Sequence, residues 1–331
     1  MSPAASRRCS TSSMSPTPPP LTRISTRVST GRTSGRSTTR TDTDTHCGTA
    51  FRRPRSHERG QHMTDSTQSR LFKDAAAVAA RAQRDPLRRA FRSEMELGFK
   101  RDARDIVTVH DKATERALVA ALTAAVPDSA FLGEEGGAIG EGRVRWYIDP
   151  IDGTSNFAAG IAFWCVSIAA EVEGSIVAGV VYDPVADILF SADLDGAYLD
   201  DRPLRSRGAQ TEDEATLITG YPNARDLDAH GDAALERFGA LVAAYRALRR
   251  PGSAAMSICH VAAGWVDVAA GFAVNPWDVS AAGFILTQAG GVYRGMGGEP
   301  GAPVYHRPGY VATVAGLDCP TLDAVAEAIT A

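Results

Sequence analysis

A chain of 331 residues with 44% hydrophobic and 22% charged residues has the length and composition of one large or two small globular domains. Its net charge of −4 is unevenly divided: residues 1–62 hold eleven Arg, no Lys and three acids, a net of +8, which leaves −12 for the rest. An acidic body disfavours general nucleic-acid binding. The sequence contains no stretch of about 18 consecutive apolar residues without charge, so no membrane span is predicted.

Residues 1–66 form a segment rich in Ser, Thr, Arg and Pro that lacks apolar periodicity. Such a segment cannot bury enough surface to offset its ordering entropy, so we expect an extension outside the fold. Three interpretations stay open: a start assigned too early, with Met63 as the alternative; a disordered basic tail; or an organellar transit peptide. None of them carries the catalytic function.

The pattern changes after residue 66. Apolar residues at helical spacing predict helix over most of 70–98, divided near Pro86, and a second helix at 111–125. Short strands then follow, and turn residues between them indicate an antiparallel meander. These strands are predicted at 144–148, 165–172, 176–182, 188–191 and 197–199.

Helices and strands alternate after about residue 210. Glycines at 290 and 291 would end the last long helix before the C-terminus. Two layered halves, 67–210 and 211–331, fit this order, and ligands often bind where such halves meet. The elements predicted here are strands at 217–219 and 266–270 and helices at 229–245, 254–263 and 279–289.

The five cysteines are scattered, odd in number and without a C-x-x-C pair. This distribution argues against a disulfide framework and a zinc site, and it favours a reducing cytoplasm.

Carboxylates gather around the segment DPIDGT, residues 149–154, which follows the apolar run 144–148. Pro150 interrupts strand pairing and Gly153 turns the chain, so Asp149 and Asp152 lie at a strand end and can point into one space. The backbone N–H groups that follow can open a helix, which would place an anion site beside a cation site. Taken alone, this segment is also a common turn.

Acids elsewhere in the chain strengthen the metal interpretation. Glu134 and Glu135 follow an apolar pair, Asp111 opens a predicted helix, and Asp278 starts an apolar helix, where a helix N-cap is the alternative. If these acids converge, two like charges ~4 Å apart repel by about 4 kcal/mol at a dielectric of about 20. All-oxygen ligands select Mg²⁺ or Mn²⁺ before Zn²⁺, and paired divalent ions indicate phosphoryl transfer to water.

Several segments resemble the signature blocks of the inositol monophosphatase family, in the right order over roughly residues 70–330. The most specific block is WYIDPIDGTSNF at 146–157. The others are 105–111, GEE at 133–135, GSAA at 252–255, WDVSAAG at 277–283 and AGG at 289–291.

The resemblance implies a layered αβαβα sandwich of the inositol monophosphatase and fructose bisphosphatase type, usually a homodimer. It also implies a Mg²⁺-dependent and often lithium-sensitive enzyme. By position, Glu134, Asp149 and the carbonyl of Ile151 would hold the first metal ion. Asp149, Asp152 and Asp278 would hold the second, and a third, weaker ion would lie near Glu134 through water.

The resemblance also assigns catalytic and phosphate-binding roles. Thr154, assisted by Asp111 or Glu134, would orient the attacking water. The backbone N–H groups of Gly153 and Thr154 would hold the phosphate.

The substrate-binding residues are less sharply indicated. Ser253 and Ala254 would line the pocket, and Lys100 falls where the family often has a lysine, although a solvated lysine is the alternative. Gly271 stands where many inositol-specific members have a glutamate that binds sugar hydroxyls, which leaves the alcohol undefined.

The resulting hypothesis is Mg²⁺-dependent hydrolysis of a small phosphate monoester, foremost inositol 1-phosphate. Alternatives on the same site are histidinol phosphate, fructose 1,6-bisphosphate and 3′-phosphoadenosine 5′-phosphate. A binding or regulatory protein that kept the fold but lost turnover is a different class. Nucleic-acid binding through the Arg-rich tail is a further alternative, which salt-sensitive binding would reveal.

Overall fold

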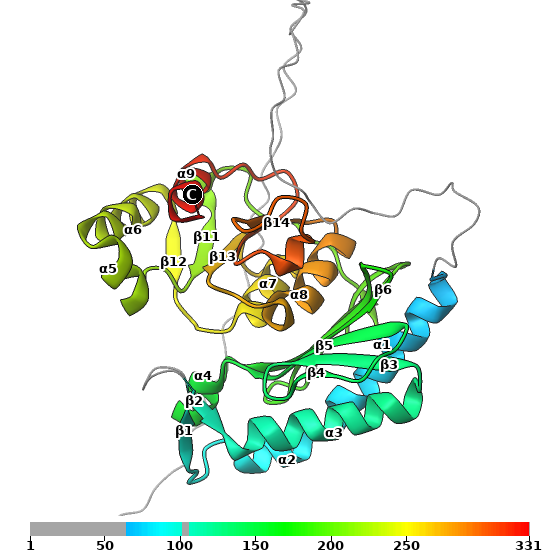
Figure 1. Cartoon of the computed structure of the whole chain (residues 1–331). Coiled ribbons are helices and arrows are strands. Elements are labelled where there is room, and N and C mark those ends of the chain that lie inside the picture. The colour runs from blue at the N-terminus through cyan, green and yellow to red at the C-terminus, as the bar shows by residue number, and fades with distance from the viewer. Residues whose placement is uncertain (1–63, 101–105, 331) are drawn as a thin grey trace, which may run out of the picture. The chain divides into compact units, whose positions relative to one another are not determined.

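The structure, a computed structural model, describes residues 64–100 and 106–330 (Figure 1). The predicted extension, including Met63, therefore lies almost entirely outside the described residues, as does the start of the 105–111 block. The described chain begins with helix α1 (Ser66–Ala82), whose N-terminus is capped by Asp65 through a bond from the N–H of Gln68.

The first predicted helix is two helices in the structure. The break falls at Gln83, between α1 and α2 (Arg84–Ala90), so Pro86 lies in the first turn of α2, where proline is tolerated. The helix ends eight residues earlier than predicted, and β1 (Leu97–Phe99) pairs instead with β2 (Ile106–Thr108).

An eight-stranded sheet contains the predicted meander, which is confirmed because neighbouring strands from β5 to β9 run antiparallel. The unpredicted β3 is parallel to β5. The strand order is β10-β9-β8-β7-β6-β5-β3-β4. The strands are β3 (Ser129–Gly133), β4 (Gly137–Ile139), β5 (Val144–Asp152), β6 (Cys165–Val172), β7 (Ser175–Asp183), β8 (Ile188–Asp193), β9 (Gly196–Leu199) and β10 (Arg202–Pro203).

A five-stranded sheet follows in the order β12-β11-β13-β15-β14. The helix predicted at 229–245 corresponds to α6 (Asp232–Ala244), and an unpredicted helix, α5 (Ala224–His230), precedes it; Gly231, with a positive φ of 53°, separates the two. The strands are β11 (Thr216–Thr219), β12 (Ala247–Arg249), β13 (Val268–Phe272), β14 (Val292–Met296) and β15 (Gly309–Thr313).

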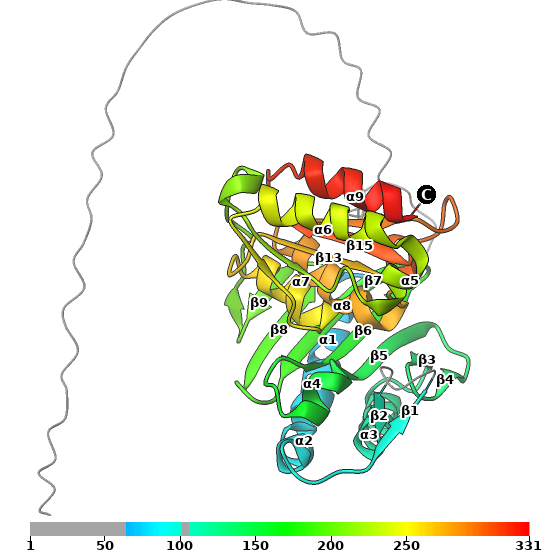
Figure 2. The same ribbon diagram turned by 90° about the vertical axis from the view of Figure 1, so that its left-hand side faces the viewer.

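Helices and sheets alternate in five layers, which confirms the predicted αβαβα fold (Figures 1 and 2). Helices α1 and α3 (Val109–Ala125) cover one face of the eight-stranded sheet. Helices α7 (Ala254–Ala262) and α8 (Pro276–Gln288) lie between the two sheets, and α6 and α9 (Pro320–Thr330) cover the outer face of the second.

Helix α8 is apolar on nearly every side because it is enclosed between the sheets. It crosses β7 so closely that a Cβ on Gly179 would lie 2.8 Å from the carbonyl oxygen of Ala281. The C-terminal part of the chain therefore completes the core over the N-terminal sheet. The predicted boundary between 67–210 and 211–331 stays a prediction.

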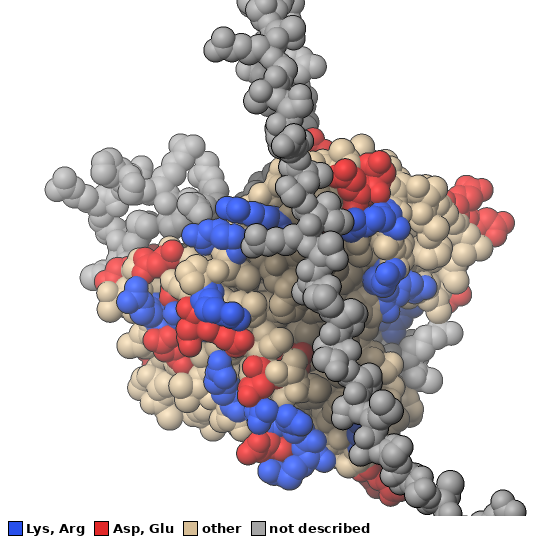
Figure 3. Space-filling view, turned by 180° about the vertical axis from the view of Figure 1, so that it is seen from behind, with Lys and Arg blue, Asp and Glu red and all other residues tan. Residues whose placement is uncertain are grey.

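The surface carries charges of both signs. On the face shown in Figure 3, Lys and Arg side chains are interspersed with Asp and Glu, so the described residues there form no single-sign patch. Among the described residues, no helix is both long and apolar enough to cross a bilayer.

Candidate active site

The central acids lie where β5 ends. Pairing between β5 and β6 shifts register between Asp149 and Asp152, which lets both carboxylates leave the strand toward the same side. Gly153 then turns the chain with φ 99° into helix α4 (Thr154–Ala159). A Cβ on Gly153 would lie 3.1 Å from the carbonyl oxygen of Phe163, so both the conformation and the space require glycine.

Asp152 is buried and held by the start of α7. Its Oδ2 accepts the Ser253 hydroxyl at 2.5 Å and the Ala255 N–H at 2.7 Å, and its Oδ1 faces the Ala254 N–H at 3.3 Å. Burial nevertheless raises the pKa of Asp152 to about 6, while these donors lower it. The two residues predicted to contact substrate, Ser253 and Ala254, are therefore partners of a predicted metal ligand.

Glu134 reaches the same space from the end of β3. Its backbone N–H donates to the Ile148 carbonyl at 3.2 Å, which ties the turn after β3 to β5. Its side chain accepts Lys100 Nζ at 2.8 Å, and Lys100 also pairs with Glu135 at 2.5 Å. Burial disfavours the charged lysine, but the two glutamates outweigh this and raise the pKa of Lys100. Lys100 therefore pairs with both glutamates while its residue stays exposed, and its role in the site stays a prediction.

Asp278 joins the acids from the start of α8. The alternative prediction of an N-cap was wrong by three positions, because Asn275 is the N-cap and Asp278 is the third helical residue. Asp278 Oδ2 accepts the Asn275 N–H at 2.7 Å, as in a capping box. Burial and the negative charge of Asp152 raise the pKa of Asp278 to about 8.

The four acids affect one another electrostatically. Burial raises the pKa of Asp149 well above its usual value, and the charges of Glu134, Asp152 and Asp278 raise it further. Still, no group of three His, Cys, Asp or Glu side chains in the described part of the chain is arranged so that it could hold an ion. The structure brings the predicted ligands into one region, but Lys100 binds Glu134 and Ser253 binds Asp152 there.

Thr154 and Asp111 form the predicted pair beside these acids. The Thr154 hydroxyl lies 3.0 Å from Asp111 Oδ1 and 3.0 Å from the Ile151 carbonyl. Asp111 is fully buried, and its other oxygen accepts both the N–H and the hydroxyl of Thr108, at 2.8 and 2.6 Å. Burial is the main cause that raises the pKa of Asp111.

Sequence reasoning missed Glu115, which supports the turn that carries Glu134. The buried Glu115 carboxylate accepts the N–H groups of Glu135 and Gly136 at 2.8 and 2.6 Å. It also fills the space that a Cβ on Gly133 or Gly136 would need. A signal was present, because Glu115 follows Asp111 by four residues and so lies on the same side of α3.

The chain also matches a known protein family over most of its length. A model of the inositol monophosphatase family matches residues 62–328. The chain belongs to the inositol monophosphatase family. Members of this family are phosphatases and are generally Mg²⁺-dependent.

Relatives within the family bear different names. The chain is 38% identical over 231 residues to "Nus factor SuhB" of Pseudomonas aeruginosa, which covers 67% of this chain and 85% of that protein. It is 32% identical over 233 residues to inositol monophosphatase 1 of Sus scrofa, with 69% and 84% covered. The structure of extragenic suppressor protein suhB from Bartonella henselae matches with a TM-score of 0.68 and 29% identity, covering 78% of this chain and 98% of that one.

The donor atoms of this inositol monophosphatase family member suit divalent magnesium in kind, although no three of the described acids are yet arranged to hold an ion. The available donors are carboxylate and carbonyl oxygens, which hard cations prefer to nitrogen or sulfur ligands. Burial, and then repulsion by the neighbouring acids, raises the pKa values of Asp149 and Asp278. A divalent cation would relieve this repulsion, and the Lys100 ammonium already pairs with Glu134.

Replacing Glu115 by Gln should weaken Mg²⁺ activation. An amide would present N–H groups to the backbone donors of Glu135 and Gly136 and so loosen the turn that carries Glu134. We expect the Mg²⁺ concentration for half-maximal activity to rise roughly 10- to 100-fold, with much of the rate restored at saturating Mg²⁺. Glu141→Gln, at an exposed position, is the control. An unchanged Mg²⁺ titration in Glu115→Gln would show that this contact does not position the site.

Proposed function

We propose that this protein is a Mg²⁺-dependent phosphatase that hydrolyses a small phosphate monoester. The observation that carries the proposal is the convergence of Glu134, Asp149, Asp152 and Asp278, from three separate segments, into one region where burial and then the charges of neighbouring acids raise the pKa values of Asp149 and Asp278. Maintaining buried like charges is costly unless the site uses them to bind cations. Family membership supports the same activity.

We assign the metal ligands by position. Glu134, Asp149 and the Ile151 carbonyl would hold one ion, and Asp149, Asp152 and Asp278 would hold a second. We also propose a third ion near Glu134. Mn²⁺ could replace Mg²⁺, because it binds to the same oxygen donors. The chemistry that these ions supply when bound is positive charge beside the phosphate oxygens and a water that loses its proton more readily.

The protein's own groups then orient the reactants. The Thr154 hydroxyl points its proton toward Asp111 or the Ile151 carbonyl, which leaves its oxygen free to accept a hydrogen bond from water. Because Asp111 is fixed by Thr108, this orientation is held without substrate. The attacking water is thereby positioned at the start of α4.

The same helix start would receive the phosphate. The N–H groups of Gly153 and Thr154 belong to the first residues of α4, where backbone donors lack partners within the helix. Such donors stabilise negative charge that develops on phosphoryl oxygens during in-line attack. No covalent phosphoenzyme is required for this route.

Inositol 1-phosphate is the first substrate to test, because a relative from Mesorhizobium japonicum is named inositol-1-monophosphatase. We also expect a cytoplasmic homodimer that is inhibited by Li⁺ and whose folded body does not bind nucleic acid. The name "Nus factor" of the Pseudomonas relative favours a second candidate, a binding protein without turnover.

A substrate panel separates these candidates. We expect phosphate release from inositol 1-phosphate or another monoester with millimolar Mg²⁺, and its loss on chelation with EDTA. The other members of the panel are histidinol phosphate, fructose 1,6-bisphosphate and 3′-phosphoadenosine 5′-phosphate. No release from any of them, by a protein that is folded by circular dichroism, would reject the enzyme and favour the binding protein.

A further inference from the structure

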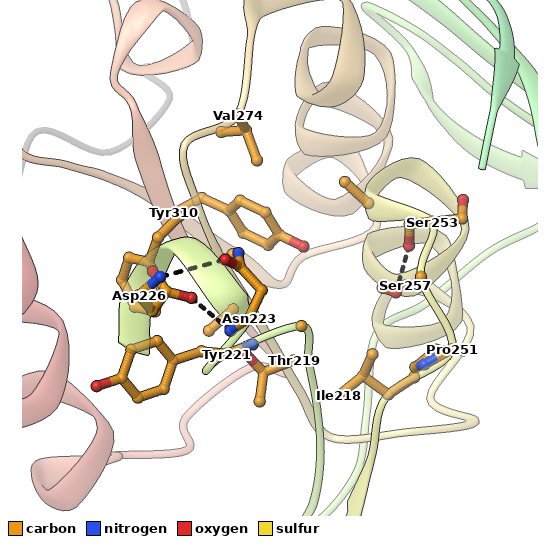
Figure 4. Close-up of a pocket in the computed structure, with 16 residues that line it drawn as sticks. Ile218, Thr219, Tyr221, Asn223, Asp226, Pro251, Ser253, Ser257, Val274 and Tyr310 are labelled. Atoms are coloured by element: carbon orange, nitrogen blue, oxygen red, sulfur yellow. Dashed lines mark hydrogen bonds between the residues drawn. The ribbon is translucent and has the colours of Figure 1, made fainter. Parts of the chain in front are cut away.

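A pocket of about 160 Å³ opens beside the acids (Figure 4). It lies where β11, β13 and β15 meet the starts of α5 and α7, and Figure 4 shows Asn223 and Asp226 on one side and Ser253 and Ser257 on the other. Three aromatic side chains, from Tyr221, Phe272 and Tyr310, contribute to its wall.

The pocket adjoins the acids through two residues. Ser253 lines it and donates to Asp152, and a Cβ on Gly153 would lie 3.4 Å from the Ser253 Cβ. Tyr310 lines it as well, and the charges of Asp152 and Asp278 add to burial in raising the pKa of the Tyr310 phenol. A phosphate held at the start of α4 would therefore direct its alcohol portion into this pocket.

Tyr310 determines the shape of the pocket opposite Gly271. A Cβ on Gly271 would lie 2.6 Å from Tyr310 Cε1, so the ring occupies the space into which a side chain at 271 would extend. At this wall the pocket is therefore bounded by the ring and hydroxyl of Tyr310, and a longer side chain at position 271 would have no room.

The charge of the pocket comes from a single side chain. Among its lining residues in the described chain, Asp226 is the only charged one, and it is half-buried. One of its oxygens accepts the Asn223 N–H at 2.6 Å. The guanidinium of Arg250 donates to the carbonyls of Gly220 and Pro222 and does not line the pocket. No lysine or arginine of the described chain is thus available in this wall to bind a second phosphate.

We propose that this pocket selects phosphate monoesters by the charge of their alcohol portion, with Asp226 and the aromatic wall favouring an organic ammonium group and disfavouring a second phosphate. This proposal rests on the phosphatase activity proposed above and names the substrate class of that site. An ammonium group gains from both a nearby carboxylate and aromatic faces. A second phosphate would meet the like charge of Asp226 without a compensating cation.

The test uses two esters of the same shape that differ in one charge. Phosphocholine carries a trimethylammonium group, and 3,3-dimethylbutyl phosphate carries an uncharged tert-butyl group in its place. With the full-length protein and saturating Mg²⁺, we expect kcat/KM for phosphocholine to exceed that for the neutral ester by roughly five- to tenfold. Inositol 1-phosphate should be hydrolysed faster than inositol 1,4-bisphosphate for the same reason.

Asp226→Asn tests the assigned residue. The amide oxygen can still accept the Asn223 N–H, so the start of α5 is kept while the charge is lost. We expect the preference for phosphocholine to fall to about twofold or less, since the carboxylate charge that favours the ammonium group is lost and only the aromatic wall remains. Asp228→Asn, on the same helix but outside the pocket, should keep the wild-type preference.

The outcomes separate this proposal from the phosphatase proposal. Turnover of both esters with no preference for phosphocholine, or with a preference that Asp226→Asn leaves intact, would overturn the charge-selective pocket alone. Absence of turnover of every monoester by the folded wild-type protein would overturn the phosphatase activity, and with it this pocket's role. Loss of the preference in Asp228→Asn as well would also count against Asp226.

Discussion

Replacing Asp152 by Asn should reduce kcat by at least about a hundredfold while leaving the fold in place. The remaining side-chain oxygen can still accept the Ser253 hydroxyl and the Ala255 N–H, so the start of α7 keeps its contacts. The negative charge, however, is lost at the residue proposed to hold the second ion. Phosphate release from the preferred monoester at saturating Mg²⁺ measures the effect, and circular dichroism checks the fold.

Asp183→Asn is the matched control. Asp183 is also a buried aspartate at a strand end, and its carboxylate accepts two backbone N–H groups, from Val185 and Ala186. It contributes nothing to the acid group, so its variant should keep the wild-type rate. A wild-type kcat in Asp152→Asn would remove Asp152 from the mechanism.

Asp278→Asn should make the metal-free protein more stable at pH 8. A folded-state pKa of about 8 against 3.8 means that the folded protein holds a proton that the unfolded chain has released in this range. The stability from this proton is complete below about pH 4 and is lost as the pH rises toward 8. In EDTA, the wild-type Tm should therefore fall from pH 5 to pH 8, whereas the variant should show a flatter profile and a Tm higher by about 2–8 °C at pH 8.

Magnesium should reverse this order. Added Mg²⁺ binds the folded wild-type protein and should raise its Tm, by mass action, more than that of Asp278→Asn. Glu299→Gln, at an exposed site, should follow the wild type in both conditions. Identical pH profiles for the wild type and Asp278→Asn in EDTA would show that repulsion at Asp278 does not limit stability.

The fold was predictable where apolar periodicity is long and turns are well marked. The strand at 165–172 has the predicted bounds, and the helices at 254–263 and 279–289 differ from α7 and α8 by one to three residues. Short elements were not predictable, since β3 and β1 depend on pairing with distant strands rather than on their own sequence. Helix α5 was missed because its sequence, ARDLDAH, has no apolar periodicity and none of its residues is buried.

The candidate site was predictable as a set of residues but not as a network. Asp149 and Asp152 are recognisable from one local segment, Glu134 and Asp278 stand out as acids beside apolar runs, and the resemblance added their roles as metal ligands. The contact of Ser253 with Asp152 joins positions 101 residues apart, and sequence spacing does not encode such a contact. Tyr310 was missed for the same reason, because only the pairing of β13 with β15 places it against Gly271.

The position of α8 has a consequence for how this protein is made. The ribosome completes the eight-stranded sheet, which ends at Pro203, well before it reaches Pro276. Until α7 and α8 emerge, the nascent chain exposes the apolar face of β6 and β7 that these helices later cover. Exposed apolar strands of this kind attract chaperones or other unfinished chains, so the interval between the emergence of Pro203 and that of α8 is the stage at which aggregation is most to be expected.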